Sequence, residues 1–166
     1  MGAVAVVLDS SVSPQEVLLV KHSYRPKGSW GLPGGALESI DGSPTKPGSG
    51  ASPDDVIEAA LRREIWEELG MKIDVVHFLR VDAVPYVPEE PGPYRLDFYY
   101  LCAPSQGFAQ LRAGIASGSI RSPSAEITEI KMVRLTELIK YDLFSADERF
   151  LRDDLPRLIS HPSQPS

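Results

Sequence analysis

The chain is short of the residues that mark several classes of protein. Its single cysteine, Cys102, cannot form an internal disulfide bond, and the apolar, strand-like run around it is typical of a buried structural thiol. No apolar run reaches eighteen residues and no basic-then-apolar leader is present, so we expect neither a membrane span nor a secretory signal. These absences predict a protein of the reducing cytoplasm without a membrane partner.

The signatures of several other binding sites are also missing. Neither G-x-x-x-x-G-K-[ST] nor G-x-G-x-x-G occurs at a strand-to-helix junction, which disfavours P-loop and Rossmann folds. His77 and His161 have no partners at zinc-ligand spacing. The net charge of −6 argues against nucleic-acid binding, which usually relies on clustered lysine and arginine, so we expect no stable nucleic-acid complex. Small phosphorylated substrates remain compatible with this charge because a bound metal reverses the local sign.

What the chain contains is enough for one domain. It has 166 residues, of which 42% are hydrophobic and 24% are charged. We predict a single domain over residues 1–160. A Gly/Ser/Pro-rich tract at about 39–52 has little to bury and is predicted to be a flexible insertion, and residues 161–166 a disordered tail.

The periodic segments predict strands and helices that are mixed without strict alternation. Strands are predicted at 2–8, 16–21, 73–84, 94–102 and 127–135, with the first two joined as a hairpin. A helix is predicted over 52–70, with Ser52 as its N-cap and Gly70 at its C-terminus. Residues 145–148 (SADE) resemble a capping box for a terminal helix that ends near Pro156 or a little beyond, and 105–124 is a loop or a weak helix. This order favours an α/β (α+β) sandwich.

Three carboxylates and an arginine lie close together in Arg63–Gly70 (REIWEELG). On a helix Glu64 is one turn from both Glu67 and Glu68, so the three carboxylates point the same way and repel one another. A hard divalent cation would offset this repulsion and would bring a substrate phosphate into the same coordination sphere. The alternative is a solvated acidic helix face, which is the usual interpretation of such a pattern without further context.

The residues around this cluster supply that context. Trp30–Glu38 (WGLPGGALE) followed by Ala59–Met71 (AALRREIWEELGM) is similar to the two halves of the Nudix box, G-x5-E-x7-R-E-U-x-E-E-x-G-U, in which U is a bulky aliphatic residue. Gly35 fits the opening glycine. Every fixed position of the second half is matched, by Arg63, Glu64, Ile65, Glu67, Glu68, Gly70 and Met71. The chain therefore resembles the Nudix (MutT-like) family.

Two departures from the family pattern affect this resemblance. Asp55 stands where the family places its first box glutamate. Gly35 and Asp55 are twenty positions apart, whereas the pattern expects six, so the box is split by an insertion of fourteen residues. Lengthening a loop costs little closure entropy, so the glycine turn and the helix can each remain intact.

The resemblance implies an α/β/α sandwich with a mixed β-sheet and a metal-dependent hydrolase. Its reaction would cleave the diphosphate bond of a nucleoside diphosphate linked to another moiety, such as ADP-ribose, with Mg²⁺ or Mn²⁺. The implied metal ligands are Glu64, Glu67, Glu68 and a carbonyl near Gly35, while Arg63 would orient a neighbouring carboxylate. The implied catalytic residues are Glu64, Glu68 and Glu126. The general base is either Glu64 or Glu126, and Glu129 is a close rival of Glu126.

The residues that contact the substrate are less well determined. Arg25 and Lys27 are placed to meet phosphate or sugar groups, although a solvated loop explains them about as well. Trp30 is a candidate for stacking on a base, although an aromatic side chain in a strand more often serves packing. Pro85 and Pro88 lie about where Nudix enzymes similar to ADP-ribose pyrophosphatases often have a proline. The nearby Tyr86 instead resembles a feature of diadenosine polyphosphate hydrolases.

Several alternatives remain open at this point. Other substrates of the same reaction are diadenosine polyphosphates and oxidised or ordinary nucleoside triphosphates. A function of another class is a non-catalytic Nudix-like module that binds a nucleotide and regulates. The resemblance also makes a homodimer an expectation, because dimers are common among similar proteins.

Overall fold

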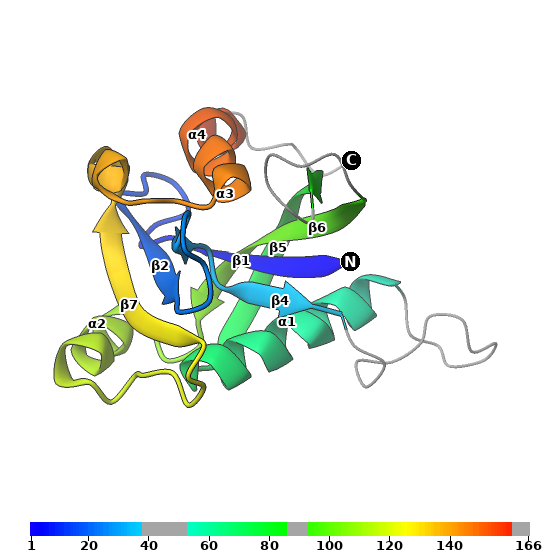
Figure 1. The fold of residues 1–166 in the computed structure, drawn as a ribbon. Coiled ribbons are helices and arrows are strands. Elements are labelled where there is room, and N and C mark those ends of the chain that lie inside the picture. The colour runs from blue at the N-terminus through cyan, green and yellow to red at the C-terminus, as the bar shows by residue number, and fades with distance from the viewer. Residues whose placement is uncertain (38–52, 86–92, 161–166) are drawn as a thin grey trace.

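A computed structural model of the chain describes residues 1–37, 53–85 and 93–160 (Figure 1). The predictions made for the insertion at 39–52, for Ser52, for Tyr86 and Pro88, and for the tail at 161–166 lie outside the described residues.

The strands form two sheets, one mixed and one antiparallel. The larger sheet has the order β4-β1-β6-β5 and is built from Gly34–Ala36, Gly2–Val7, Tyr94–Pro104 and Ile73–Pro85. Strands β1 and β6 run parallel, while β4 and β5 pair antiparallel to their neighbours. The smaller sheet has the antiparallel order β3-β2-β7, with Trp30–Gly31, Glu16–His22 and Ile127–Arg134.

Helices cover both sides of these strands (Figure 1). On one side lies α1, Pro53–Leu69. On the other lie α3 (Ser145–Arg149), a π-helical turn at Phe150–Asp154 and α4 (Leu155–Ser160). The remaining helical segments are α2 (Phe108–Ser117) and a 3₁₀ helix, Leu135–Lys140. None of the helices in the described ranges is long and apolar enough to span a bilayer.

Strand β1 contributes to two hydrophobic clusters because successive side chains of a strand point to opposite faces. Ala3, Ala5 and Val7 pack in the cluster that contains the apolar stripe of α1. That stripe consists of Ile57, Leu61, Ile65 and Leu69. Val4 and Val6 pack in a second cluster, with Phe150, Leu151 and Leu155 of the C-terminal helical segment. The predicted α/β/α sandwich with a mixed sheet is therefore confirmed.

The predicted hairpin between the first two strands is wrong. Strands β1 and β2 belong to different sheets, and the two segments are joined beyond them by a bridge between Leu8 and Val17 and by the hydrogen bonds of Asp9 with Gln15 and Glu16. All six residues of β1 are buried, so the strand needs neighbours along both edges and a layer on each face. Its position between β4 and β6, inside the larger sheet, supplies both.

The predicted capping box at residues 145–148 is also wrong. Phe144 occupies the N-cap position of α3, and no side chain there accepts a hydrogen bond from the helix. Asp147 is buried and bonds to another part of the chain, as described below. The helical segment continues past Pro156, because the wider π-helical turn before it accommodates a residue without an N–H group.

Candidate active site

The glycine turn between β3 and β4 meets the carboxylate side of α1. The backbone N–H of Gly34 donates a hydrogen bond to Oε2 of Glu68, at 3.2 Å. Gly34 has φ +149°, and a Cβ there would overlap the backbone of Ala3. A Cβ on Gly35 would overlap the Glu64 carboxylate. Both positions therefore require glycine, because only a residue without a side chain lets the turn approach the helix this closely.

Arg63 fixes the position of its neighbours on α1. Its Nη1 atom lies 2.9 Å from Oε1 of Glu64 and 2.9 Å from Oε2 of Glu67, and Nη2 donates to the carbonyl of Ala36 at 3.1 Å. The planar guanidinium thus connects the helix to β4 through charge-assisted hydrogen bonds. The structure gives Arg63 the orienting contacts that the sequence predicts.

Glu68 is a buried carboxyl of α1 with a strongly perturbed pKa. Its pKa is raised from the ordinary value of 4.5 to about 8, mainly by burial and also by the negative charges of Glu64 and Glu126, against the opposing effects of the Gly34 N–H and of Arg25. Only 8% of the residue is exposed. A buried carboxyl beside two others is the arrangement that a bound cation would stabilise, since it would relieve both the desolvation and the repulsion.

The pairing of β2 with β7 separates the two rival glutamates. The N–H of Ser23 donates to the carbonyl of Glu126 at 2.7 Å, which places this residue within electrostatic range of Glu68. Glu129 instead forms ion pairs with Lys21 and Lys131, each at 2.9 Å, and the hydrogen bonds from these two amines lower its pKa. The structure therefore brings Glu126, rather than Glu129, to the box helix.

The predicted substrate-binding residues have different surroundings. The Arg25 guanidinium lies 4.5 Å from the ring centroid of Phe144 and 5.6 Å from that of Tyr24, and its charge acts on Glu68. Lys27 is exposed. Trp30 is 7% exposed, and its ring meets the ring of Tyr141 edge-on at 5.1 Å. This burial fits packing, and a role of Trp30 or Lys27 in substrate binding remains a prediction.

The oxygen donors around the glycine turn suit a hard divalent cation. Glu64 and Glu68 both face the turn, and a carboxylate pair with nearby backbone carbonyls is the donor set that Mg²⁺ and Mn²⁺ prefer. Glu67, whose side chain is 54% exposed, is held by Arg63. Within residues 1–37, 53–85 and 93–160, no three histidine, cysteine or carboxylate side chains are gathered closely enough to form a metal centre. The place of Glu67 among the ligands therefore remains a prediction.

Asp147 is a residue of this region that the sequence did not indicate as functional. Its side chain accepts hydrogen bonds from the N–H of Leu32, at 3.0 Å, and from the hydroxyl of Tyr99, at 3.4 Å. It is 6% exposed. Its position in an apparent capping box concealed this role, because the same short polar pattern begins many helices.

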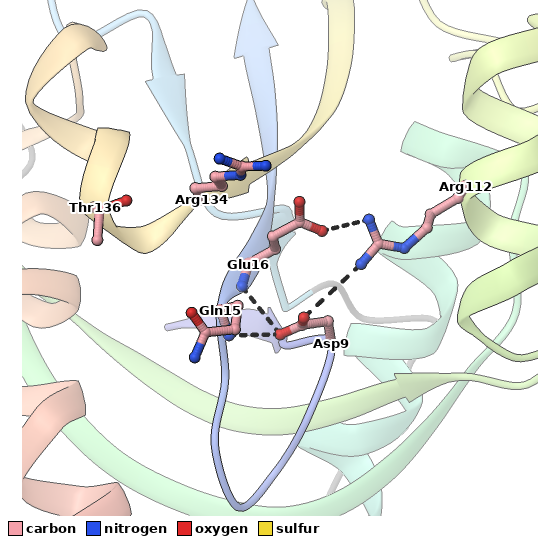
Figure 2. A pocket seen from close by; sticks show the side chains of 6 residues that line it. All are labelled: Asp9, Gln15, Glu16, Arg112, Arg134 and Thr136. Atoms are coloured by element: carbon pink, nitrogen blue, oxygen red, sulfur yellow. Dashed lines mark hydrogen bonds and ion pairs between the residues drawn. The ribbon is translucent and has the colours of Figure 1, made fainter.

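A separate polar pocket of about 390 Å³ lies where β1 ends and β2 begins (Figure 2). Asp9 accepts the backbone N–H groups of Gln15 and Glu16 at 2.8 and 3.0 Å, and so closes the turn between these strands. Arg112 reaches from α2 to both Asp9 and Glu16. The ion pairs of this pocket connect α2 to the turn, and we assign them a structural role.

Comparison with known proteins decides the family. A family model described as NUDIX domain matches residues 1–154. The chain belongs to the Nudix family. This result confirms the resemblance that the split box carries, and with it the predicted class of enzyme, a Nudix-type pyrophosphohydrolase.

Solved structures of Nudix proteins share the fold. The NUDIX domain of Shewanella oneidensis NrtR, complexed with ADP ribose, has 17% sequence identity and a TM-score of 0.63, over 95% of this chain and 86% of that chain. A MutT NUDIX hydrolase from Burkholderia pseudomallei has 22% identity and a TM-score of 0.61, over 92% and 95%. A UDP-X diphosphatase has 20% identity and a TM-score of 0.62, over 99% and 64%. Among curated proteins, the comparison found no match.

Proposed function

We propose that this Nudix protein is a divalent-metal-dependent hydrolase that cleaves the diphosphate bond of a nucleoside diphosphate joined to another group, such as ADP-ribose. The observation that carries the proposal is the buried Glu68 carboxyl, which faces the glycine turn with Glu64 and Glu126 close enough to repel it. Such a cluster destabilises the protein by itself, and a bound cation gives it a use.

Glu64 and Glu68 are the residues that would hold the metal, with Glu67 and a carbonyl near Gly35 as further ligands. When bound, Mg²⁺ or Mn²⁺ would neutralise phosphate oxygens and acidify a bound water. The protein's own groups keep the two carboxylates in place. Arg63 holds Glu64 from one side, and the N–H of Gly34 holds Glu68 from the other. Second partners of this kind orient the first ligands of a metal site.

We assign the general base to Glu126. It is exposed, so water reaches it, and it lies within electrostatic range of Glu68. Glu64, the alternative, is already engaged in an ion pair with the Arg63 guanidinium. The two lysines around Glu129 lower the pKa of that residue and so reduce its tendency to accept a proton.

Arg25 is the group best placed to meet the phosphates of the substrate. The rings of Phe144 and Tyr24 support its guanidinium, and its charge reaches Glu68. ADP-ribose is our first choice of substrate because the NrtR NUDIX domain, which has the same fold, has been solved with that ligand. Diadenosine polyphosphates and nucleoside triphosphates remain alternatives within the same reaction.

A second candidate function is a nucleotide-binding regulatory module without turnover. The fold similarity to NrtR favours it, since that protein has also been solved with a 27mer DNA. The retained carboxylates of α1 and the net charge of −6 argue against it. We therefore place the hydrolase first.

Two further expectations accompany the proposal. We propose a cytoplasmic location, where a reducing environment suits a free thiol such as Cys102, whose pKa burial raises to about 12. A homodimer also remains a prediction, and sedimentation velocity of the purified protein tests it.

The test of the hydrolase is turnover of a substrate panel with Mg²⁺ or Mn²⁺. The panel comprises ADP-ribose, nucleotide sugars, diadenosine polyphosphates and nucleoside triphosphates. Glu68→Gln removes the charge that we assign to metal binding. Glu58→Gln is the matched control, because Glu58 lies on the same helix in an ion pair with Arg62. Turnover that is lost only in Glu68→Gln supports the hydrolase and ranks the substrates. Metal-dependent nucleotide binding without turnover would instead support the regulatory module.

A further inference from the structure

The segment 142–147, which leads into α3, is bonded along the glycine turn and the strand before it. The N–H groups of Gly28 and Trp30 donate to the side chain and the carbonyl of Asp142, at 2.7 and 3.0 Å. The N–H of Phe144 donates to the carbonyl of Trp30 at 2.7 Å. The N–H of Leu32 donates to Oδ2 of Asp147, which ends this series two residues before Gly34. The C-terminal segment thus supports the turn that contacts Glu68.

Gly31 leaves the space in which this support is built. A Cβ on Gly31 would lie 2.6 Å from Oδ2 of Asp147 and 3.4 Å from Nη1 of Arg25. The carboxylate and the guanidinium therefore both lie against the backbone of Gly31, at the end of β3. Phe144 adds its ring to the same guanidinium from the start of α3. One short helix thus contacts both the backbone before Gly34 and the side chain of Arg25.

A buried carboxylate is a costly way to support a loop. Asp147 is 94% buried, and burial raises its pKa to about 6, although the N–H of Leu32 and the charge of Arg25 act in the opposite direction. Burial of such a group destabilises the folded protein unless hydrogen bonds or opposite charges compensate for the lost water. It bonds to the Leu32 N–H and to the hydroxyl of Tyr99, and the charge of Arg25 acts on it.

We propose that Asp147 is a positioning residue of the active site, which holds the glycine turn so that the Gly34 N–H remains bonded to Glu68 and the Arg25 guanidinium remains beside Gly31. It acts through Leu32 and Arg25 and does not contact the reacting atoms. The assignment rests on the proposed function only where it concerns metal and substrate, because the link from Asp147 to Gly34 is a property of the metal-free protein.

The test compares Asp147→Ala with Asp147→Asn by amide hydrogen exchange and by Mn²⁺ binding. In Asp147→Ala we expect exchange of the Leu32 N–H to be about tenfold faster, and exchange of the Gly34 N–H several-fold faster, because a hydrogen bond to a carboxylate is lost. The Kd for Mn²⁺, measured by electron paramagnetic resonance, should rise about tenfold. Asp147→Asn keeps an oxygen that accepts the Leu32 N–H, so it should restore protection at both amides.

The exposed Asp153 supplies matched controls on the next helical turn, as Asp153→Ala and Asp153→Asn, which should leave every value at the wild-type level. Faster exchange at Leu32 with unchanged exchange at Gly34 and an unchanged Kd for Mn²⁺ would overturn the inference. Equal losses of amide protection and of Mn²⁺ affinity in Asp153→Ala would also overturn it. If the wild-type protein binds no Mn²⁺, the proposed function fails, and the exchange of Gly34 alone decides the role of Asp147.

Discussion

Glu68 should make the metal-free protein less stable as the pH rises. Burial gives the folded protein a Glu68 pKa of about 8, against an ordinary value of 4.5. The folded state therefore binds more protons than the unfolded state between these values. The contribution of Glu68 to stability is greatest below about pH 4.5, falls as the pH rises toward 8, and is constant beyond that. The effect of pH on stability is thus opposite to that of a salt-bridged carboxyl, whose lowered pKa makes the folded state more stable as the pH rises.

The size of the effect follows from the two pKa values. Each pH unit between them corresponds to about 1.4 kcal/mol. The full interval gives an upper limit of about 5 kcal/mol, and relaxation around the ionised group lowers this, so we expect a loss of about 3 to 5 kcal/mol between pH 4.5 and 9. Glu68→Gln stays neutral and should show no such loss from this position. The variant should therefore be the more stable protein at pH 9.

Urea unfolding in EDTA at pH 5, 7 and 9 measures this difference for the wild type, Glu68→Gln and the control Glu58→Gln. At pH 8, Mg²⁺ at a hundred times its Kd should restore about 2.7 kcal/mol to the wild type and nothing to Glu68→Gln. Parallel stability curves for the wild type and Glu68→Gln across this pH range would refute the reasoning, because they would show that Glu68 ionises in the folded protein as readily as in the unfolded chain.

Three further substitutions test the remaining parts of the site. Gly35→Ala adds a methyl group where the Glu64 carboxylate lies, and should cost about 1 to 3 kcal/mol in urea unfolding as well as weakening Mn²⁺ binding. Arg63→Ala should lower metal affinity or activity by about 10- to 100-fold, whereas Arg62→Ala on the exposed side of the helix should change neither. Glu126→Gln should lower kcat by about 10²- to 10⁴-fold. A larger loss in Glu129→Gln than in Glu126→Gln would show that the base is assigned to the wrong residue.

The strand and helix positions were predictable wherever the pattern was local. The strands predicted at 73–84 and 94–102 carry many β-branched or aromatic side chains, and these segments form β5 and β6. The helix predicted for 52–70 is α1, and Gly70 follows it with φ +63°, as a C-terminal glycine does. Residues 105–124, predicted as a loop or a weak helix, contain α2, which ends before Gly118 in the same left-handed conformation.

Strand partners were not predictable in the same way. The short polar turn between β1 and β2 favours a hairpin, yet each strand pairs with segments far away in the sequence. Strands choose partners by the burial of both faces, and neither face can be identified from one strand alone. The same limit applies to Asp147, whose partner Leu32 is 115 positions away.

The residues of the box indicate the family and the chemistry of the site without any tertiary information. Arg63, Glu64, Glu67 and Glu68 lie within two turns of one helix, so their mutual proximity follows from helix geometry alone. Which residues from later in the chain join this cluster depends on the fold. The pairing of β2 with β7 places Glu126 near Glu68 and leaves Glu129 with two lysines, and the C-terminal segment places Asp147 against the glycine turn. These contacts depend on the sandwich that brings distant segments together, and local sequence patterns do not predict that packing.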